Sequence, residues 1–292
     1  MANSLFIGLV THPRSRFPDA RGAHGLAARL ASRIAGSDWS VVTAQQTENL
    51  VDPADIDLSP AATRASIEKE LQTEGDWWLF HHHARLPLRK RLVLAARRTA
   101  RFWKYVGPSA AARTGGQVML ERLANIERAH LSLMEQALNA GCQWALILED
   151  DAQSSNPDEL ANDLTNHLNA WNNTPQPSYV NMSESFAVTE LGLSQELRRH
   201  SAWNSNREVF SATIPFTNTV CAMLYRREFL QTLVQELRSI PLEPIIPIDW
   251  KLNKAIMALS HSGKLGADDC YVVIPAPIVQ GSMHAPPFPA QG

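Results

Sequence analysis

Three consecutive carboxylates, Glu149, Asp150 and Asp151, are the residues whose types and spacing indicate chemistry most directly. They follow the continuous apolar run 144–148, which is typical of a central strand covered on both faces. Adjacent carboxylates repel one another, so they need a cation or hydrogen-bond donors. Ligands of open α/β sheets bind at the carboxyl ends of strands, and oxygen ligands favour Mn²⁺ or Mg²⁺. We therefore expect Glu149 and Asp151 to hold such an ion and Asp150 to contact a bound cofactor.

Two further observations bear on this expected metal site. Asp150 or Asp151 could instead cap the helix or turn that follows, because Asp is favoured at helix N-termini. Three acids in a row at the end of a buried strand favour the metal site. His284 follows the last predicted strand in a Gly- and Pro-rich context, so a C-terminal segment that folds over the site could supply it as a third ligand. A histidine in an exposed tail is the alternative.

Several landmarks carry more information by their order and spacing than they do singly. They are residues 9–16, 126–131 with His130, a helix running to Gly141, the acidic motif at 145–151, a strand near Cys221 to Tyr225, Pro247-Ile248-Asp249 and a closing stretch at 275–282. This combination resembles glycosyltransferase family 25, the lipopolysaccharide-type transferases with a GT-A fold. In that family a Ser-His-Leu element on a helix precedes a Leu-Glu-Asp-Asp motif.

The resemblance implies a nucleotide-diphosphate sugar of the UDP or GDP type as donor, a divalent metal ion, and a hydroxyl acceptor such as a glycan or glycolipid. The chain has Glu127-Arg128-Ala129 where the family has Gly-Cys and Ser before its histidine. His130 itself lies at helical spacing from apolar residues, which indicates a buried, hydrogen-bonded histidine. The basic segment 81–105 has no counterpart in the family.

Asp249 and Glu184 are the candidates for the general base. An inverting transfer needs a carboxylate within hydrogen-bond reach of the acceptor hydroxyl. Asp249 is the first choice, although its simpler role is that of N-cap of the helix that it begins. Glu184 follows a predicted strand, where a position in a surface loop is the alternative.

The first predicted strand ends in residues that could hold the nucleotide. Thr11, Arg14 and Arg16 lie at its carboxyl end, and arginine offers forked donors to phosphate oxygens. Solvated loop charges are the alternative.

Strands and helices alternate along most of the chain, which predicts an α/β fold with a mostly parallel central sheet flanked by helices. With the resemblance, this is a GT-A-like, Rossmann-like architecture. Residues 1–285 are expected to form one domain, with a basic helical insertion and loop at 81–116 and an irregular tail at 286–292. The predicted strands are 4–11, 39–43, 76–80, 144–148, 178–182, 219–224 and 271–274, and the predicted helices are 20–34, 60–71, 87–105, 117–140, 157–171, 226–240 and 249–260.

Positive charge is concentrated between Asp76 and Glu121, where nine of the 27 Lys and Arg residues lie and no acid does. The segment 85–105 mixes these charges with apolar and aromatic residues. Its simplest interpretation is a solvated helix, and a peripheral contact with an anionic acceptor or membrane is the functional alternative. Nucleic acid is not expected, because no nucleic-acid motif accompanies the charge. His81-His82-His83 is expected to lie in a loop near an anionic ligand.

Composition excludes several classes of protein. Of 292 residues, 45% are hydrophobic and 19% charged, which excludes disorder, collagen and coiled coil for the whole chain, and the net charge is −2. The three cysteines have no disulfide or zinc-ribbon spacing. With no signal peptide expected and no long apolar stretch, we predict a cytoplasmic protein that is at most peripheral at the membrane.

The sequence therefore predicts a metal-dependent glycosyltransferase. A sugar nucleotidyltransferase is the competing enzyme, but such enzymes usually begin with a Gly-rich phosphate loop and a lysine, which are missing after residues 5–10. A non-catalytic relative that binds a nucleotide or a partner is the third alternative.

Overall fold

The computed structural model describes residues 3–12, 15–52, 57, 59–84, 87–106, 110–172, 177–184, 197–217, 219–241 and 246–284. Within these ranges, the side chains of residues 110–117, 119, 184, 283 and 284 are not described. The tail predicted at 286–292 therefore lies outside the described residues.

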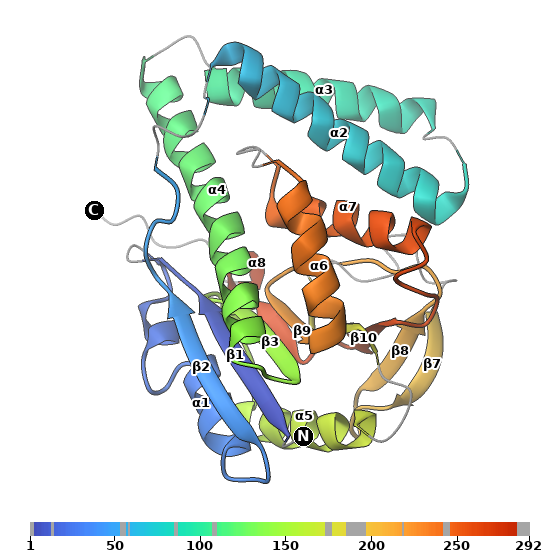
Figure 1. Ribbon diagram of the computed structural model, residues 1–292. Coiled ribbons are helices and arrows are strands. Elements are labelled where there is room, and N and C mark those ends of the chain that lie inside the picture. The colour runs from blue at the N-terminus through green and yellow to red at the C-terminus, as the bar shows by residue number, and fades with distance from the viewer. Residues whose placement is uncertain are drawn as a thin grey trace.

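An eight-stranded sheet forms the centre of the molecule (Figure 1). In spatial order its strands are β2 (Ser40–Gln46), β1 (Ser4–Val10), β3 (Trp144–Glu149), β9 (Ala222–Arg226), β5 (Tyr179–Asn181), β10 (Cys270–Ile274), β8 (Glu208–Ala212) and β7 (Leu197–Ala202). Six of these eight strands run in one direction, and β9 and β8 run in the other. The expected α/β class and mostly parallel sheet are thus confirmed, with two antiparallel strands inserted.

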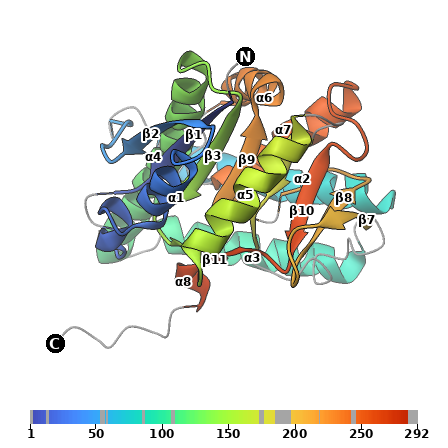
Figure 2. The same cartoon turned by 90° about the horizontal axis from the view of Figure 1, so that it is seen from below.

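Helices cover both faces of this sheet (Figures 1 and 2). One face packs against α4 (Ala110–Asn139), α6 (Arg227–Ser239) and α7 (Ile248–His261), and the other against α1 (Leu26–Ile34) and α5 (Pro157–Trp171). A pair of helices, α2 (Pro60–His82) and α3 (Leu88–Val106), lies outside these layers and packs on α7 and α4. The short helix η1 (Pro18–Arg21) precedes α1.

A second, three-stranded sheet lies beside the carboxyl end of β3. It consists of β4 (Ala152–Gln153), β11 (Ile278–Gln280) and β6 (Ser183–Glu184), and β11 continues directly into the short helix α8 (Gly281–His284). This small sheet brings the C-terminal part of the described chain next to the acidic motif.

The burial of β3 follows from its sequence. Trp144, Leu146 and Leu148 belong to the core cluster on the α1 and α5 face, whereas Ala145 and Ile147 belong to the cluster beneath α4 and α6. Successive side chains of a strand point to opposite faces, so a strand covered on both sides needs an unbroken apolar run. The prediction of a doubly covered central strand is confirmed.

Most other predicted elements are present with small shifts of their ends. The helices predicted at 157–171, 226–240 and 249–260 are α5, α6 and α7, and the basic helix predicted at 87–105 is α3. Gly141 follows α4 with a φ of 73°, a left-handed conformation in which glycine carries no steric penalty, as predicted for a helix end. The hairpin of β7 and β8 was not predicted.

The predicted strand at 76–80 is wrong, because these residues form the last turns of α2. A short apolar run does not distinguish a strand from a buried helical segment, and tertiary contacts decide between them. Here the Trp77 ring packs edge-on against Trp250 of α7, with ring centroids 6.1 Å apart. The Trp78 ring stacks on His82, one helical turn later, with centroids 3.8 Å apart.

Two further predictions in the same region are corrected. The loop expected to contain Gly115 and Gly116 is helical, because α4 begins at Ala110 rather than at residue 117, whereas Gly107 and Pro108 lie outside the described residues. Each glycine costs about 1 kcal/mol in a helix interior, which the neighbouring alanines and the packing of a long helix can offset. The histidines expected in a loop end α2 instead, with His83 as its C-cap.

Candidate functional site

The three acids lie where the main sheet ends. Glu149 is the last residue of β3, and Asp150 and Asp151 form the turn that leads into β4. The parallel register of β1 and β3 places Val10 opposite Glu149, so the residues that follow β1 lie beside the acids. The expected position of the acidic motif, at the carboxyl end of a central strand, is confirmed.

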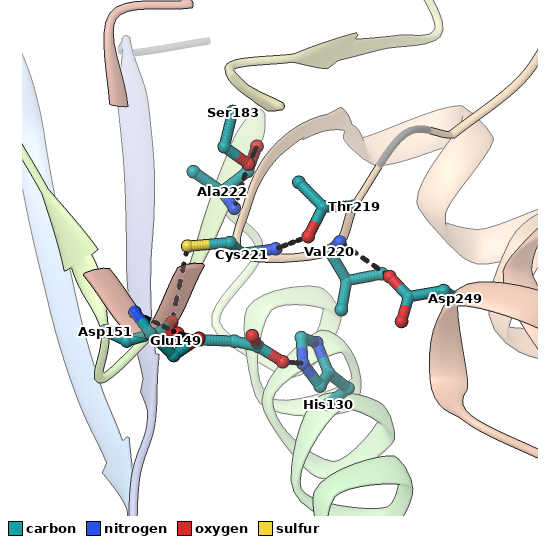
Figure 3. A network of polar contacts seen from close by, with 10 residues as sticks. His130, Glu149, Asp151, Ser183, Thr219, Val220, Cys221, Ala222 and Asp249 are labelled. Carbon is teal, nitrogen blue, oxygen red and sulfur yellow. Dashed lines mark hydrogen bonds and ion pairs between the residues drawn. The ribbon is translucent and has the colours of Figure 1, made fainter. Parts of the chain in front are cut away.

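Strand β9 brings a cysteine to the same place. It runs antiparallel to β3, and the Glu149 backbone N–H donates to the Cys221 carbonyl oxygen at 2.9 Å. The Cys221 thiol lies 3.5 Å from Oδ1 of Asp151. Glu149, Asp151 and Cys221 each offer one ligand atom, and these atoms lie within 4.8 Å of one another. Residues 70 positions apart in sequence thus form a cluster with the dimensions of a metal site (Figure 3).

Cys221 in this cluster is a thiol rather than a thiolate. It is completely buried, and burial together with the negative charges of Asp151 and Glu149 raises the pKa of Cys221 well above that of a free cysteine. Its proton is therefore available for the hydrogen bond to Asp151. The carboxylate oxygens are the ligand atoms that remain for a cation.

Histidine 130 approaches the cluster from α4. The Nε2 atom of His130 lies 3.1 Å from Oε1 of Glu149, and His130 is buried. The interpretation of His130 as a buried, hydrogen-bonded histidine is confirmed, and its partner is a residue of the acidic motif. The other ring nitrogen, Nδ1, has no hydrogen-bond partner among the described residues.

Asp150 faces the end of β1. Its Oδ2 atom accepts a hydrogen bond of 3.4 Å from the Thr11 hydroxyl, so Thr11, which is predicted to contact the nucleotide, lies beside the acidic motif. Burial is the main cause that raises the pKa of Asp150, and the charges of Asp151 and Glu149 add to it, whereas hydrogen bonds from Ser15 and Thr11 act in the opposite direction. The acidic motif therefore concentrates negative charge.

The segment after β11 closes over Asp151, as expected for a C-terminal segment. Ser282 donates its hydroxyl to Oδ2 of Asp151 at 2.5 Å, and the Gly281 N–H donates to the Asp151 carbonyl oxygen at 2.7 Å. A Cβ atom on residue 281 would lie 3.0 Å from the Asp151 carbonyl oxygen, so glycine favours this close approach. The described part of this segment thus contacts the acids through Ser282, whereas the side chain of His284 lies outside the described residues.

The acids do not serve as helix caps. Asn156 caps α5 by accepting from the Glu159 N–H, so neither Asp150 nor Asp151 has that role. Asp249 lies in the first turn of α7, whose N-cap is Pro247, and its Oδ1 atom instead accepts from the Val220 N–H at 3.0 Å. The interpretation of these acids as helix N-caps is therefore wrong.

Asp249 faces the acidic cluster from the opposite side (Figure 3). It is partly buried, and burial together with the negative charge of Glu149 raises the pKa of Asp249 to about 6. His130 and the hydrogen bond from Val220 act in the opposite direction. A carboxyl group with this pKa can accept a proton near neutral pH, as a general base must.

The raised pKa has a consequence for stability. The folded protein binds the Asp249 proton more tightly than the unfolded chain does, so this stabilisation is complete below pH 4 and is lost as the pH rises through about 6. We expect Asp249→Asn, which cannot ionise, to gain stability over the wild type between pH 4 and pH 7, by as much as about 3 kcal/mol. Urea unfolding at both pH values measures the difference. A stability difference that does not change with pH would contradict the raised pKa.

A buried ion pair begins two residues after Asp249 in α7. Lys251 of α7 donates to Oε2 of Glu127 on α4 at 2.6 Å and to the Pro241 carbonyl oxygen at 3.0 Å. Lys251 and Glu127 are both buried. The sequence showed Glu127 only as a departure from the family motif, whereas the structure gives it a partner that connects the helix of His130 to the helix of Asp249.

The structure does not bring three of the predicted site residues to the acidic cluster through a described side-chain contact. Glu184 lies in β6, where it pairs with Val279 of β11, but its side chain is not described. Arg14 lies outside the described residues, and Arg16 is exposed in the loop after β1. Cys221 and Ser282 were not predicted as site residues, because only the pairing of β9 and β11 with their neighbours brings them to Asp151.

The basic segment is largely compensated on its inner side. Arg98 and Arg101 of α3 form ion pairs with Glu68 and Glu70 of α2, and Arg97 lies 3.6 Å from Glu74. A cavity of about 190 Å³ between the two helices is lined by Arg64, Ile67, Arg98, Thr99 and Phe102, but both of its arginines pair with Glu68. Two arginines thus share one carboxylate, which leaves one positive charge at this cavity that Glu68 does not compensate.

His81, at the end of α2, does not add positive charge near pH 7. His81 is buried, and burial with the neighbouring His82 and His83 lowers the pKa of His81 to about 3. His81 is therefore neutral near pH 7, and the expectation that it lies near an anionic ligand loses its electrostatic basis. No helix in the part of the chain that the structure describes is both long and apolar enough to cross a bilayer.

Comparison with known proteins adds no relative. No family model matches the chain, and no match is found among curated proteins.

Proposed function

We propose that this protein is a metal-dependent glycosyltransferase that moves a sugar from a nucleotide-diphosphate sugar to a hydroxyl acceptor. The observation that carries the proposal is the convergence of Glu149 and Asp151 at the end of β3, with Asp249 facing them from α7. The mixed sheet, with its acidic motif at a strand end, is compatible with a GT-A fold. The resemblance to glycosyltransferase family 25 supports the same assignment.

The acidic residues fit a hard divalent cation. Among the described residues, no Lys or Arg forms an ion pair with Glu149, Asp150 or Asp151, and the donors to Asp151 are the neutral groups of Cys221 and Ser282. Three neighbouring carboxylates without a cationic partner repel one another. Glu149 and Asp151 would hold Mn²⁺ or Mg²⁺ through their oxygens, and the ion would offset the charge of the leaving diphosphate.

Asp249 is proposed as the general base. Its carboxylate takes the proton of the acceptor hydroxyl while the acceptor oxygen bonds to the anomeric carbon and the bond from that carbon to the diphosphate breaks. The hydrogen bond from the Val220 N–H holds Oδ1 of Asp249, which leaves Oδ2 for the acceptor. Glu184 remains the second candidate, since it lies in the strand next to β11.

The remaining residues position this machinery. His130 orients Glu149 through its Nε2 atom, and Thr11 does the same for Asp150 at the end of β1. Thr11, with Arg14 and Arg16, is proposed to contact the nucleotide of a UDP or GDP donor. We propose a glycan or glycolipid as the acceptor class.

The donor site is tested by thermal unfolding with UDP and GDP, each with and without Mn²⁺. A nucleotide at about 100 times its dissociation constant stabilises the folded state by about 2.7 kcal/mol. We expect a rise in Tm of about 5 °C for one nucleotide, only with Mn²⁺ present, and no rise for Asp151→Asn. Asp38→Asn, which changes an exposed carboxylate in the turn before β2, is the matched control and should respond as the wild type does.

The same experiment distinguishes a hard ion from a thiolate-bound ion. Cys221→Ser keeps a hydroxyl donor toward Asp151, so the Mn²⁺-dependent rise should persist. Loss of the rise in Cys221→Ser alone would show that sulfur holds the metal and would contradict an oxygen site. No rise with any nucleotide, or an undiminished rise in Asp151→Asn, would overturn the proposed donor site.

A further inference from the structure

Helix α3 has an apolar stripe on its outward side. Leu88, Leu92, Ala96 and Trp103 follow the spacing that places side chains on one face of a helix, and all four are exposed. The exposed fraction is 63% for Leu92 and 57% for Trp103, and 70% for Leu88 in the first turn. Large apolar residues gathered on one exposed helical face are unusual for a surface without a partner.

The opposite side of α3 accounts for its attachment to the protein. Leu94 is buried there, and Phe102 and Tyr105 pack against the small core cluster of Ile67 and Leu120. The ion pairs from α3 to Glu68, Glu70 and Glu74 lie on this side as well. The outward stripe is therefore not needed to hold α3 in place.

The outward stripe is accompanied by positive charge. Arg89, Arg91 and Lys104 of α3 are exposed, and none of the ion pairs among the described residues involves them. No acid occurs between residues 76 and 121, so nothing on α3 offsets these charges. In Figure 1 the α2 and α3 pair forms one end of the molecule, where α3 can meet a flat surface.

We propose that the outward face of α3 is a docking surface for an anionic lipid bilayer. Leu88, Leu92 and Trp103 would enter the boundary between headgroups and acyl chains, and Arg89, Arg91 and Lys104 would contact anionic headgroups. The helix would lie in the plane of the membrane, consistent with a sequence too charged to span it.

Charge favours the membrane over a second copy of this chain. Two α3 faces packed against each other would bring basic residues into one interface without an acidic residue on either helix. An anionic bilayer offers both complementary charge and an apolar layer. This proposal does not depend on the proposed transfer reaction, since it concerns residues far from the acids of β3.

Vesicle sedimentation of the full chain tests the docking surface. We expect binding to phosphatidylcholine vesicles that contain about one third phosphatidylserine to be about tenfold or more stronger than binding to phosphatidylcholine alone. The double variant Leu92→Ser/Trp103→Ser and the triple variant Arg89→Gln/Arg91→Gln/Lys104→Gln should each lose about tenfold or more of this binding. All five positions are exposed, so folding should be unchanged, and thermal unfolding confirms it.

Matched control variants remove exposed apolar and basic side chains outside α3. Val42→Ser takes an exposed apolar side chain from β2, and Arg29→Gln/Lys254→Gln/Lys264→Gln removes three exposed charges outside α3, so both variants should bind as the wild type does. Absence of vesicle binding, equal binding to neutral vesicles, or full binding by the α3 variants would overturn the proposal. A dimer that the α3 substitutions abolish, without vesicle binding, would also overturn it and assign the face to self-association.

Discussion

Asp249→Asn is expected to lower the rate of sugar transfer by about 10²- to 10⁴-fold, the range that a positioned general base contributes. The asparagine keeps an oxygen that can accept from the Val220 N–H, so the first turn of α7 should not move. The asparagine side chain cannot accept a proton, so the acceptor hydroxyl would have to attack while it is still protonated. Consumption of the nucleotide sugar in the presence of acceptor measures the rate, and the Mn²⁺-dependent rise in Tm with nucleotide should be retained.

The pH dependence gives this variant a second measurement. A base works when it is deprotonated, so the wild-type rate should increase as the pH rises through about 6, the pKa that burial and Glu149 give to Asp249. The residual rate of Asp249→Asn should lack this increase. A merely structural role for Asp249 would lower the rate equally at every pH.

Asp158→Asn is the matched control for Asp249→Asn. Asp158 occupies the corresponding place in the first turn of α5, but it is exposed and pairs with Arg33 on the surface. The rate of sugar transfer by the Asp158→Asn variant should remain that of the wild type. Should Asp249→Asn retain full transfer, the base would have to be sought elsewhere, with Glu184 as the first position to change.

Lys251→Met is expected to destabilise the folded state by about 3–5 kcal/mol, because it removes the ammonium group that donates to the buried carboxylate of Glu127. The energetic cost arises because the carboxylate stays buried in a medium of low dielectric constant, and not from the loss of attraction alone. Urea unfolding of the variant measures the change in the free energy of unfolding.

A double variant separates these two contributions. Glu127→Gln/Lys251→Met removes both charges, so it should recover part of the stability that Lys251→Met loses. Breaking the exposed pair of Arg33 and Asp158 should cost much less, because water screens both charges, which makes Asp158→Asn the control for a surface pair. A cost for Lys251→Met as small as that of the surface pair would show that the buried pair is solvated and does not fix α7 against α4.

The described structure shows how far local patterns determine this fold. The apolar run of β3 and the acids at its end could be placed from the sequence. A strand covered on both faces needs an unbroken run of apolar residues, and the charged residues that follow it mark its end. The run at 76–80 could not be placed in this way, because its four apolar residues, 77–80, fit a strand and a buried helix equally well. In the structure these residues are helical, and Trp77 packs against Trp250 of α7.

The candidate site divides in the same way. Glu149, Asp150, Asp151 and Asp249 could be chosen from residue type and from their places at element ends. Cys221 and Ser282 could not, since they reach Asp151 only through the antiparallel register of β9 and the closing path of β11. Glu127 appeared in the sequence as an anomaly before His130, and only the approach of α7 to α4 supplies Lys251 as its partner.

The basic segment shows the same limit for surfaces. Its charge and helical form were evident from the sequence, as were the apolar residues among the arginines. Which of those residues face α2 and which face outward depended on the partner helix, whose acids pair with one set of arginines and leave Arg89, Arg91 and Lys104 outside.

The sequence by itself thus determined the α/β class, the central strand, the acidic motif at its end and the local concentration of positive charge. These features depend on side-chain periodicity and residue type, which act over a few residues. The tertiary structure alone decided the partners of the acids, the buried ion pair and the outward face of α3. Such contacts join residues far apart in the chain, and they depend on strand register and helix packing, which no local pattern specifies.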